Sequence, residues 1–148
     1  MSYKYLLPSL ALFVLSCDSR PADKIVLPKD YIGEVRVYYK VPNRPPLSQE
    51  KGRLVFRIPP SGILETSSPY TPGWASDRYY YFDAASRTEM EVHVNSATSL
   101  VKTWDQGVAT RFDEGRNTQV TYWHFFIGTK EDYERHRRQR LKEYRDNQ

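Results

Sequence analysis

The chain has 148 residues, which is enough for about one globular domain. Hydrophobic residues make up 39% of it and aromatic residues 14%, so a core can form without disulfide bonds, and the single cysteine excludes an internal one. The formal net charge of +4 is only mildly basic, and because basic and acidic residues are intermixed we expect no nucleic-acid partner.

The first seventeen residues resemble the signal peptide of a bacterial lipoprotein. The apolar run over residues 6–15 is too short to cross a bilayer, but it has the length of a signal-peptide core. The tetrapeptide Val14-Leu15-Ser16-Cys17 is similar to the bacterial lipobox. The resemblance implies cleavage before Cys17 and attachment of acyl chains such as palmitate to that residue, because two or more chains anchor a protein stably.

We therefore expect a signal peptide over residues 1–16, a lipidated tether over residues 17–24 and a single β-rich domain over residues 25–148. The protein would be exported and held at a membrane by the lipid on Cys17, in the periplasm or at the cell surface. Asp18 resembles the inner-membrane retention signal of many Gram-negative bacteria, so retention there is one option. A plain secreted protein without a lipid anchor is the alternative.

Beyond the tether, hydrophobic and polar side chains alternate in several short stretches, as in strands that bury one face. The clearest strands are expected at residues 34–41, 53–58, 88–94 and 119–127, and shorter ones at 25–27, 63–64, 79–82 and 100–104. Residues 42–52, rich in proline, and residues 105–117, rich in charge, are expected to be loops. The pattern predicts an all-β, sandwich-like domain of about six to eight strands, with a partly open β-barrel as the alternative.

The C-terminal segment is expected to be an α-helix over residues 130–146. It contains no proline or glycine, and Thr129 with Asp132 three residues later is typical of a capped helix start. A narrow stripe of Tyr133, Leu141 and Tyr144 could dock on the sheet. Another face carries four basic residues, which we interpret as solvated rather than as a contact for lipid headgroups or cell-wall polymers: Arg135, Arg138, Lys142 and Arg145.

Three segments of the chain carry a resemblance to a known group of proteins. They are residues 28–39 (PKDYIGEVRVYY), 52–83 (GRLVFRIPPSGILETSSPYTPGWASDRYYYFD) and 126–133 (FIGTKEDY). They are similar to a family of uncharacterised bacterial envelope proteins, many of which carry lipoprotein signals. The resemblance implies one coherent domain over most of the mature chain, and it supplies no catalytic residues.

The richest cluster of aromatic rings lies at residues 74–82. It contains more rings than one core face requires, so its members are candidate contacts for a glycan or a protein partner of the envelope: Trp74, Tyr79, Tyr80 and Tyr81. If these rings are buried, a purely structural role gains weight instead. The oligomeric state cannot be inferred from the sequence.

No catalytic motif is found in the sequence, so we assign no catalytic residue, cofactor or metal. Glu89, Glu91 and His93 share one strand face and are compatible with a metal site, but we interpret them as a solvated face. The leading hypothesis is a lipid-anchored binding or structural module of the cell envelope that is not an enzyme. The alternative is an envelope hydrolase or other enzyme with a site assembled around His124 or His93.

Overall fold

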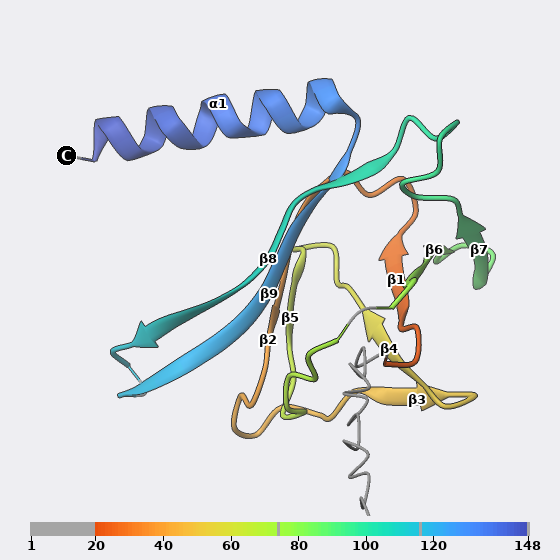
Figure 1. Cartoon of the computed structure of the whole chain (residues 1–148), viewed down its shortest axis with the longest axis horizontal. Helices are drawn as coiled ribbons and strands as arrows, with labels where there is room; N and C mark the ends of the chain where they lie inside the picture. The colour runs from red at the N-terminus through yellow and green to blue at the C-terminus, as the bar shows by residue number, and fades with distance from the viewer. Residues whose placement is uncertain (1–19, 74, 116, 148) are drawn as a thin grey trace, which may run out of the picture.

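The structure is a computed structural model that describes residues 20–73, 75–115 and 117–147. Within these ranges it contains nine β-strands in two sheets and one C-terminal α-helix (Figure 1). The expected all-β, sandwich-like fold is therefore confirmed, and the sheets do not close into a barrel. The lipidation candidate Cys17, its neighbour Asp18 and the ring of Trp74 lie outside the described residues.

The first sheet has five strands in the order β3-β4-β1-β6-β7. Their bounds are β1 Lys24–Pro28, β3 Ser48–Glu50, β4 Arg53–Arg57, β6 Arg78–Asp83 and β7 Thr88–Val92. The central strand β1 runs parallel to both of its neighbours, β4 and β6. Its apolar run Ile25–Leu27 is wholly buried, as expected for a strand that is covered on both faces.

The second sheet has four strands in the order β5-β2-β9-β8. Their bounds are β2 Gly33–Tyr38, β5 Ile63–Glu65, β8 Lys102–Asp113 and β9 Thr118–Gly128. Strand β9 lies between β2 and β8 and is antiparallel to both. Its apolar residues on both faces predicted a central position in a sheet, and this prediction is confirmed.

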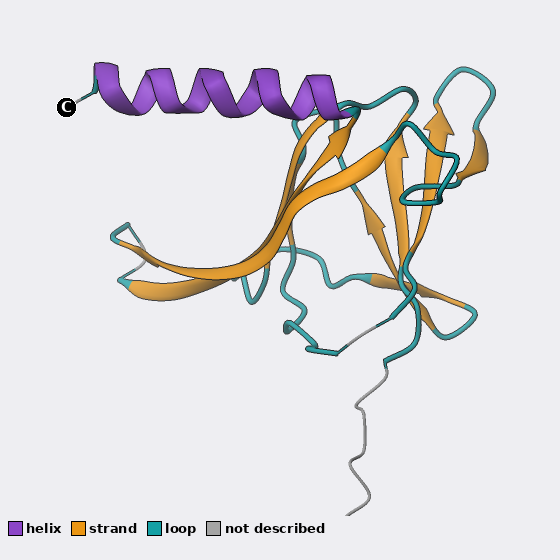
Figure 2. Cartoon of the chain, turned by 45° about the horizontal axis from the view of Figure 1, so that its top comes forward, coloured by secondary structure: helices purple, strands orange, loops and turns teal. Residues whose placement is uncertain are grey.

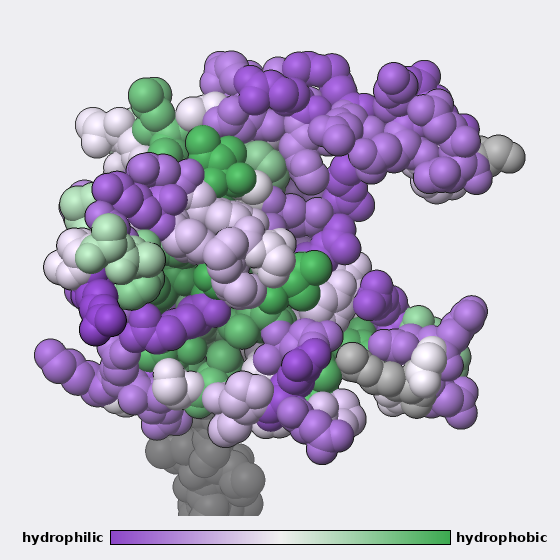
Figure 3. All heavy atoms as spheres, turned by 180° about the vertical axis from the view of Figure 1, so that it is seen from behind, coloured by the Kyte–Doolittle hydropathy of each residue, from purple (hydrophilic) through white to green (hydrophobic). Residues whose placement is uncertain are grey.

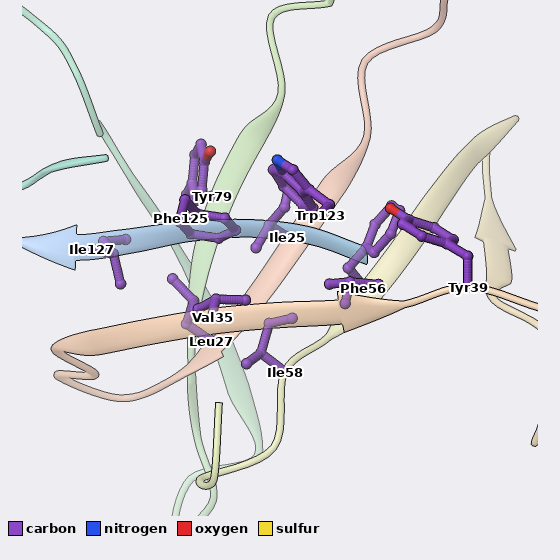
Figure 4. Packing of buried hydrophobic residues seen from close by; sticks show 11 residues of the cluster. Ile25, Leu27, Val35, Tyr39, Phe56, Ile58, Tyr79, Trp123, Phe125 and Ile127 are labelled. Carbon is purple, nitrogen blue, oxygen red and sulfur yellow. The ribbon is translucent and has the colours of Figure 1, made fainter. Parts of the chain in front are cut away.

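The two sheets pack face to face around one core (Figure 4). Ile25 and Phe56 of the first sheet meet Val35, Trp123 and Phe125 of the second, and each of these side chains is at most 8% exposed. Edge-to-face ring contacts join the sheets, with the centroids of Phe56 and Trp123 5.9 Å apart. Alternation along β2 and β9 places their core residues on one face, as the period of two requires.

Two stretches expected to be loops contain strands. Residues 105–117 were expected to be irregular, but most of them belong to β8, which has twelve residues. A bulge between Trp104 and Gly107 shifts the alternation, and Asp105 has a positive φ of 52° there. Ser48–Glu50, inside the proline-rich stretch, forms the short edge strand β3 beside β4. The short strand expected at residues 63–64 is present as β5, and it pairs with β2 of the second sheet rather than with β4, the strand that precedes it in the chain.

The helix α1 spans Lys130–Asp146, and Thr129 caps its start with the expected capping box. Thr129 Oγ1 accepts a hydrogen bond from the backbone N–H of Asp132, and the Asp132 carboxylate accepts one from the backbone N–H of Thr129. The helix extends in the same direction as the β8–β9 hairpin but is separated from it along most of its length (Figure 2). Leu141 is 55% exposed and Tyr144 67% exposed, so the expected docking stripe reaches the sheet only at its first residue, Tyr133. In the described residues, no helix is long and apolar enough to cross a membrane.

Candidate functional site

The tyrosines of β6 point to both sides of the first sheet. Tyr79 is buried in the core, with its ring centroid 6.2 Å from that of Phe125, and Tyr81 packs against the same core. Tyr80 lies between them in the sequence and therefore on the opposite face, where Nζ of Lys24 lies 5.1 Å from its ring centroid. The three tyrosines expected to contact a partner do not share one exposed face.

The outer face of the first sheet is linked by a network of ion pairs. Lys24 Nζ lies 2.6 Å from a carboxylate oxygen of Glu50 and 2.5 Å from one of Glu89, and Arg57 reaches the same two carboxylates at 3.2 and 2.8 Å. Lys24 and Arg57 lower the pKa of the Glu89 carboxyl through hydrogen bonds. Glu89, which was considered as part of a metal site, therefore contributes to a network that joins β1, β3, β4 and β7.

The histidines lie on separate elements. His93 is exposed just after β7 of the first sheet, whereas His124 is on β9 of the second sheet and faces away from the core, against the ring of Tyr122. His136 lies on α1, with Nε2 3.7 Å from Glu34. In the described part of the chain, no group of three His, Cys, Asp or Glu side chains is placed to hold a metal ion. His93 and His124, the two residues of the alternative enzyme hypothesis, are not brought together.

A cavity of about 1030 Å³ opens between the two sheets, at the end of the sandwich opposite the start of α1. Its position follows from the register of β2, in which Gly33 pairs with Ile127 beside the helix and Tyr38 with Tyr122 at the far end. Tyr39, directly after β2, lines the cavity. Because the sheets diverge at this end, the space between them is not filled by the core side chains (Figures 1 and 2).

Aromatic and aliphatic side chains form most of the cavity wall. Phe56 and Leu54 come from β4, Trp123 from β9, and Tyr39 and Tyr70 from the segments after β2 and β5. The rings of Tyr39 and Tyr70 meet edge to face with their centroids 5.3 Å apart. A concave apolar surface with a few polar groups is typical of sites for small ligands, which commonly measure about 300–1,000 Å³.

The charged part of the wall is formed by Arg20 and Asp23, which make a cluster with Asp77. Arg20 donates hydrogen bonds from Nη1 and Nη2 to the two carboxylate oxygens of Asp77 at 3.0 and 2.8 Å, and from Nη1 to Asp23 at 2.6 Å. The backbone N–H of Asp23 also donates to Asp77 at 2.9 Å. The side chain of Asp77 is only 9% exposed and that of Asp23 only 12%. The cluster fixes the residues before β1 against those before β6.

Burial changes the acidity of the groups around this cluster. Loss of solvent raises the pKa of Asp23 to about 6, with the charge of Asp77 adding to the rise and that of Arg20 opposing it. Burial also raises the pKa of the Tyr39 hydroxyl, and nearby Asp23 adds to this effect. With two carboxylates facing one guanidinium, the cluster carries excess negative charge whenever Asp23 is ionised.

Hydrogen bonds hold the two connecting segments that form another side of the cavity. Thr66 is 1% exposed, and its hydroxyl donates to the backbone carbonyl of Pro45 at 2.9 Å. The hydroxyl of Ser68 accepts from the backbone N–H of Leu47 at 2.9 Å. The segment after β5 is thereby fixed to the proline-rich stretch after β2, so this side of the cavity is held by hydrogen bonds between hydroxyl side chains and the backbone rather than by a sheet.

The bulge in β8 shapes the remaining side of the cavity. Gly107 and Val108 follow the bulge and line the cavity beside Trp123. Val108 is 45% exposed, and Phe112, four residues further on and on the same face of the strand, is 58% exposed. Two exposed apolar side chains, Val108 and Phe112, therefore continue from the cavity wall along the inner face of the β8–β9 hairpin, with Thr110 between them.

Sequence analysis did not predict this site. Arg20 and Asp23 were assigned to a tether, and Asp77 is separated from Arg20 by more than fifty residues, so no local pattern joins them. The alternation in residues 34–41 and 53–58 did indicate that Tyr39 and Phe56 face inward. The high aromatic content of the sequence was the available indication of a ring-lined site. It could not locate that site, because Tyr39, Phe56, Tyr70 and Trp123 come from four different segments of the chain.

Comparison with solved structures gives one informative neighbour. A crystal structure of a protein named as a putative lipoprotein from Bacillus anthracis is similar with a TM-score of 0.58 and 21% sequence identity, over 73% of this chain and 71% of that chain. At this identity the likeness shows a shared fold. A comparison with curated proteins gave no match.

The chain was expected to belong to an uncharacterised family, and most of its length matches a family model. One model matches residues 20–136, which include the Arg20 cluster, all nine strands, the cavity wall and the first two turns of α1. The chain belongs to the family of unknown function DUF6843.

Proposed function

We propose that this chain is a lipid-anchored protein of the bacterial cell envelope that binds an apolar ligand in the cavity between its sheets. The observation that carries the binding function is the aromatic-lined cavity of about 1030 Å³ with one charged cluster in its wall. The lipobox-like tetrapeptide ending at Cys17 supports the anchor, and so does the name of the structural neighbour.

The composition of the cavity favours binding over catalysis. Its four rings offer a large apolar contact area, and such side chains dominate the free energy of binding at ligand sites. The two charged groups in the wall, Arg20 and Asp23, are already paired with each other, and Arg20 is also hydrogen-bonded to Asp77. We assign the cluster to orienting a ligand and to fixing the cavity wall, and we assign no catalytic residue to this protein.

The anchor is tested by replacing Cys17 with alanine in the full chain. We expect the variant to leave the membrane fraction, to remain unprocessed or soluble, and to incorporate no labelled palmitate. Ser19→Ala, two residues away, is the matched control and should behave as the parent does. Unchanged fractionation together with absence of palmitate in the parent would contradict a lipid anchor and favour plain secretion.

The binding function is tested with Nile red, a neutral apolar dye whose fluorescence rises in apolar surroundings. The domain beginning at Ser19 retains every strand and every core contact described above, so it is a suitable soluble form. We expect saturable binding of one dye per chain, lost in Leu54→Trp, which fills the cavity, and retained in Tyr144→Ala at the exposed end of α1. Equal binding by the two variants would place the dye elsewhere and refute the proposed site.

A further inference from the structure

The cavity opens beside the point where the chain reaches the membrane. Arg20 lines the cavity and lies three residues after Cys17. Three residues of extended chain span at most roughly 11 Å, so an acyl group on Cys17 would hold this end of the domain at the bilayer surface. This step rests on the proposed lipid anchor.

Val108 lines the cavity, and Phe112 continues outward from it on the inner face of the β8–β9 hairpin, with Thr110 between them. In Figure 1 the hairpin and α1 both extend to the left of the sheets, with the hairpin below the helix, and the first described residues also lie on the lower side of the domain. Val108 and Phe112 are about half exposed there, and the face of α1 that Figure 3 shows is mostly hydrophilic, although Leu141 and Tyr144 of the helix are also exposed. Large apolar side chains exposed next to an apolar cavity are typical of a surface that contacts lipid or a ligand taken from it.

From this arrangement we propose that the ligand of the cavity is a single-chain amphiphile taken from the bilayer to which the protein is anchored, with its chain among Phe56, Tyr70 and Trp123 and its head at the Arg20 cluster. The proposal deepens the proposed function by naming the ligand class. A path from the bilayer would run along Phe112 and Val108 into the cavity, so that the chain need not cross water.

The charges of the Arg20 cluster also favour one kind of headgroup on the amphiphile over another. Two carboxylates, Asp23 and Asp77, face the single guanidinium of Arg20, and Tyr39 also lines the cavity. Excess negative charge in a partly buried site disfavours an anionic head by repulsion. A neutral or zwitterionic head, as in a monoacylglycerol or a lysophosphatidylcholine, fits this wall better than the carboxylate of a fatty acid.

The experiment measures displacement of Nile red from the soluble domain at pH 7.5 by amphiphiles kept below their micelle concentration. We expect lysophosphatidylcholines to displace one dye per chain, with affinity rising about four-fold per added methylene until the cavity is full. Dodecanoic acid should need at least a ten-fold higher concentration than monododecanoylglycerol. Val108→Trp, at the exposed lip of the cavity, should weaken displacement without affecting folding, and Tyr144→Ala should not.

The outcomes separate the two proposals. If Nile red binds in the cavity but no amphiphile displaces it, or if the affinity does not depend on chain length, the amphiphile is refuted and the binding cavity stands. If the fatty acid binds as well as the neutral amphiphile, the assignment of the head to the Arg20 cluster is wrong. If Nile red itself does not bind, both proposals fall.

To test the source of the ligand, the full lipidated chain is placed in phosphatidylcholine vesicles that contain a trace of lysophosphatidylcholine labelled with a photoactivatable group on its chain. We expect crosslinks to peptides that contain Phe56 or Trp123, and their loss in Leu54→Trp. Crosslinks confined to the β8–β9 hairpin would show contact with the bilayer without uptake and would overturn the proposal.

Discussion

Arg20 and Asp77 form a bidentate ion pair, with Nη1 and Nη2 of Arg20 3.0 and 2.8 Å from the two carboxylate oxygens. The side chain of Asp77 is only 9% exposed, so the pair is screened little by solvent. Because the planar fork of arginine matches a carboxylate, the pair fixes the direction as well as the distance of both side chains. The residues closest to the expected lipid anchor are thereby fixed to the cavity wall.

We predict that Arg20→Lys lowers the free energy of unfolding by about 1–3 kcal/mol, because an ammonium group cannot donate both parallel hydrogen bonds. Urea unfolding of the soluble domain measures the change. Arg44→Lys is the matched control, since Arg44 is 55% exposed in its pair with Glu65 and such pairs contribute less than about 1 kcal/mol. Equal losses in the two variants would show that burial adds nothing to the Arg20 pair.

The stability of the domain should depend on pH through Asp23. The pKa of this carboxyl is raised to about 6 in the folded state, above its ordinary value of 3.8, so the folded state binds the proton more tightly than the unfolded state does. The ionised group therefore disfavours folding above pH 6, and this cost of up to about 3 kcal/mol is relieved as the pH falls from about 6 to about 4. Relative to Asp23→Asn, the parent should gain stability over that range.

A carboxylate with the opposite shift provides the control for this pH effect. Asp83 has a lowered pKa, because it accepts hydrogen bonds from Lys29 and from the backbone N–H of Ala85. Relative to Asp83→Asn, the parent should therefore lose stability as the pH falls below about 4. Urea unfolding at a series of pH values measures both differences, and slopes of the same sign would contradict the assignment of Asp23.

Two glycines with similar backbone conformations allow steric crowding to be separated from backbone strain. Gly62 has a φ of 75° and Gly52 a φ of 77°. A Cβ on Gly62 would lie 2.2 Å from the Tyr31 hydroxyl and 2.3 Å from the carbonyl oxygen of Glu34, whereas one on Gly52 would meet nothing within 4 Å. Tyr31 also donates a hydrogen bond to that carbonyl at 2.7 Å.

We predict that Gly52→Ala costs about 1 kcal/mol of stability, which is the cost of a left-handed conformation in a residue with a Cβ. Gly62→Ala should cost at least about 2 kcal/mol more, because the methyl group forces Tyr31 or the β2 backbone to move. Thermal or urea unfolding of both variants measures the difference. If the two losses are equal, the turn relaxes without disturbing Tyr31.

The sequence could predict the strands whose alternation runs without interruption. Val35 and Val37 of β2, and Trp123 and Phe125 of β9, alternate with polar or partly exposed residues and lie in the core as expected. Strand β8 could not be predicted, because its bulge shifts the alternation at Asp105 and much of the strand lies beyond the area that the other sheet covers. A strand without continuous burial has no continuous hydrophobic pattern.

Strand pairing and the cavity depend on distant parts of the chain, which is why local patterns did not indicate them. The parallel pairs of β1 join Ile25 to Phe56 on one side and to Tyr79 on the other, and no turn sequence specifies either register. The ring-rich segment drew attention to Tyr80, but the rings that line the cavity include Tyr39, directly after β2, and Trp123 of β9. Ring density along the chain did not identify where the cavity lies.

The first turns of α1 pack against β8 and β9 through a cluster of rings. The rings of Trp104 and Tyr133 stack with their centroids 5.5 Å apart and their planes 7° from parallel, and Trp104 Nε1 donates to the carbonyl of Gly128 at 3.1 Å. Phe126 contacts both Tyr133 and His136, with centroids 5.7 and 5.0 Å apart. No described residue of the helix is buried, so this ring cluster supplies most of the packing that stabilises it.

We predict that Tyr133→Ala detaches the helix, so that amide hydrogens over residues 130–146 exchange faster with solvent, and that global stability falls by about 1–3 kcal/mol. Tyr133→Phe keeps the stacked ring and should keep the protection, and Tyr144→Ala, at a position that is 67% exposed, should also have no effect. Hydrogen exchange followed by mass spectrometry measures all three variants. Protection that survives Tyr133→Ala would mean that the capping box and the pairs along the helix, such as Glu134 with Arg138 at 3.9 Å, stabilise it without the sheet.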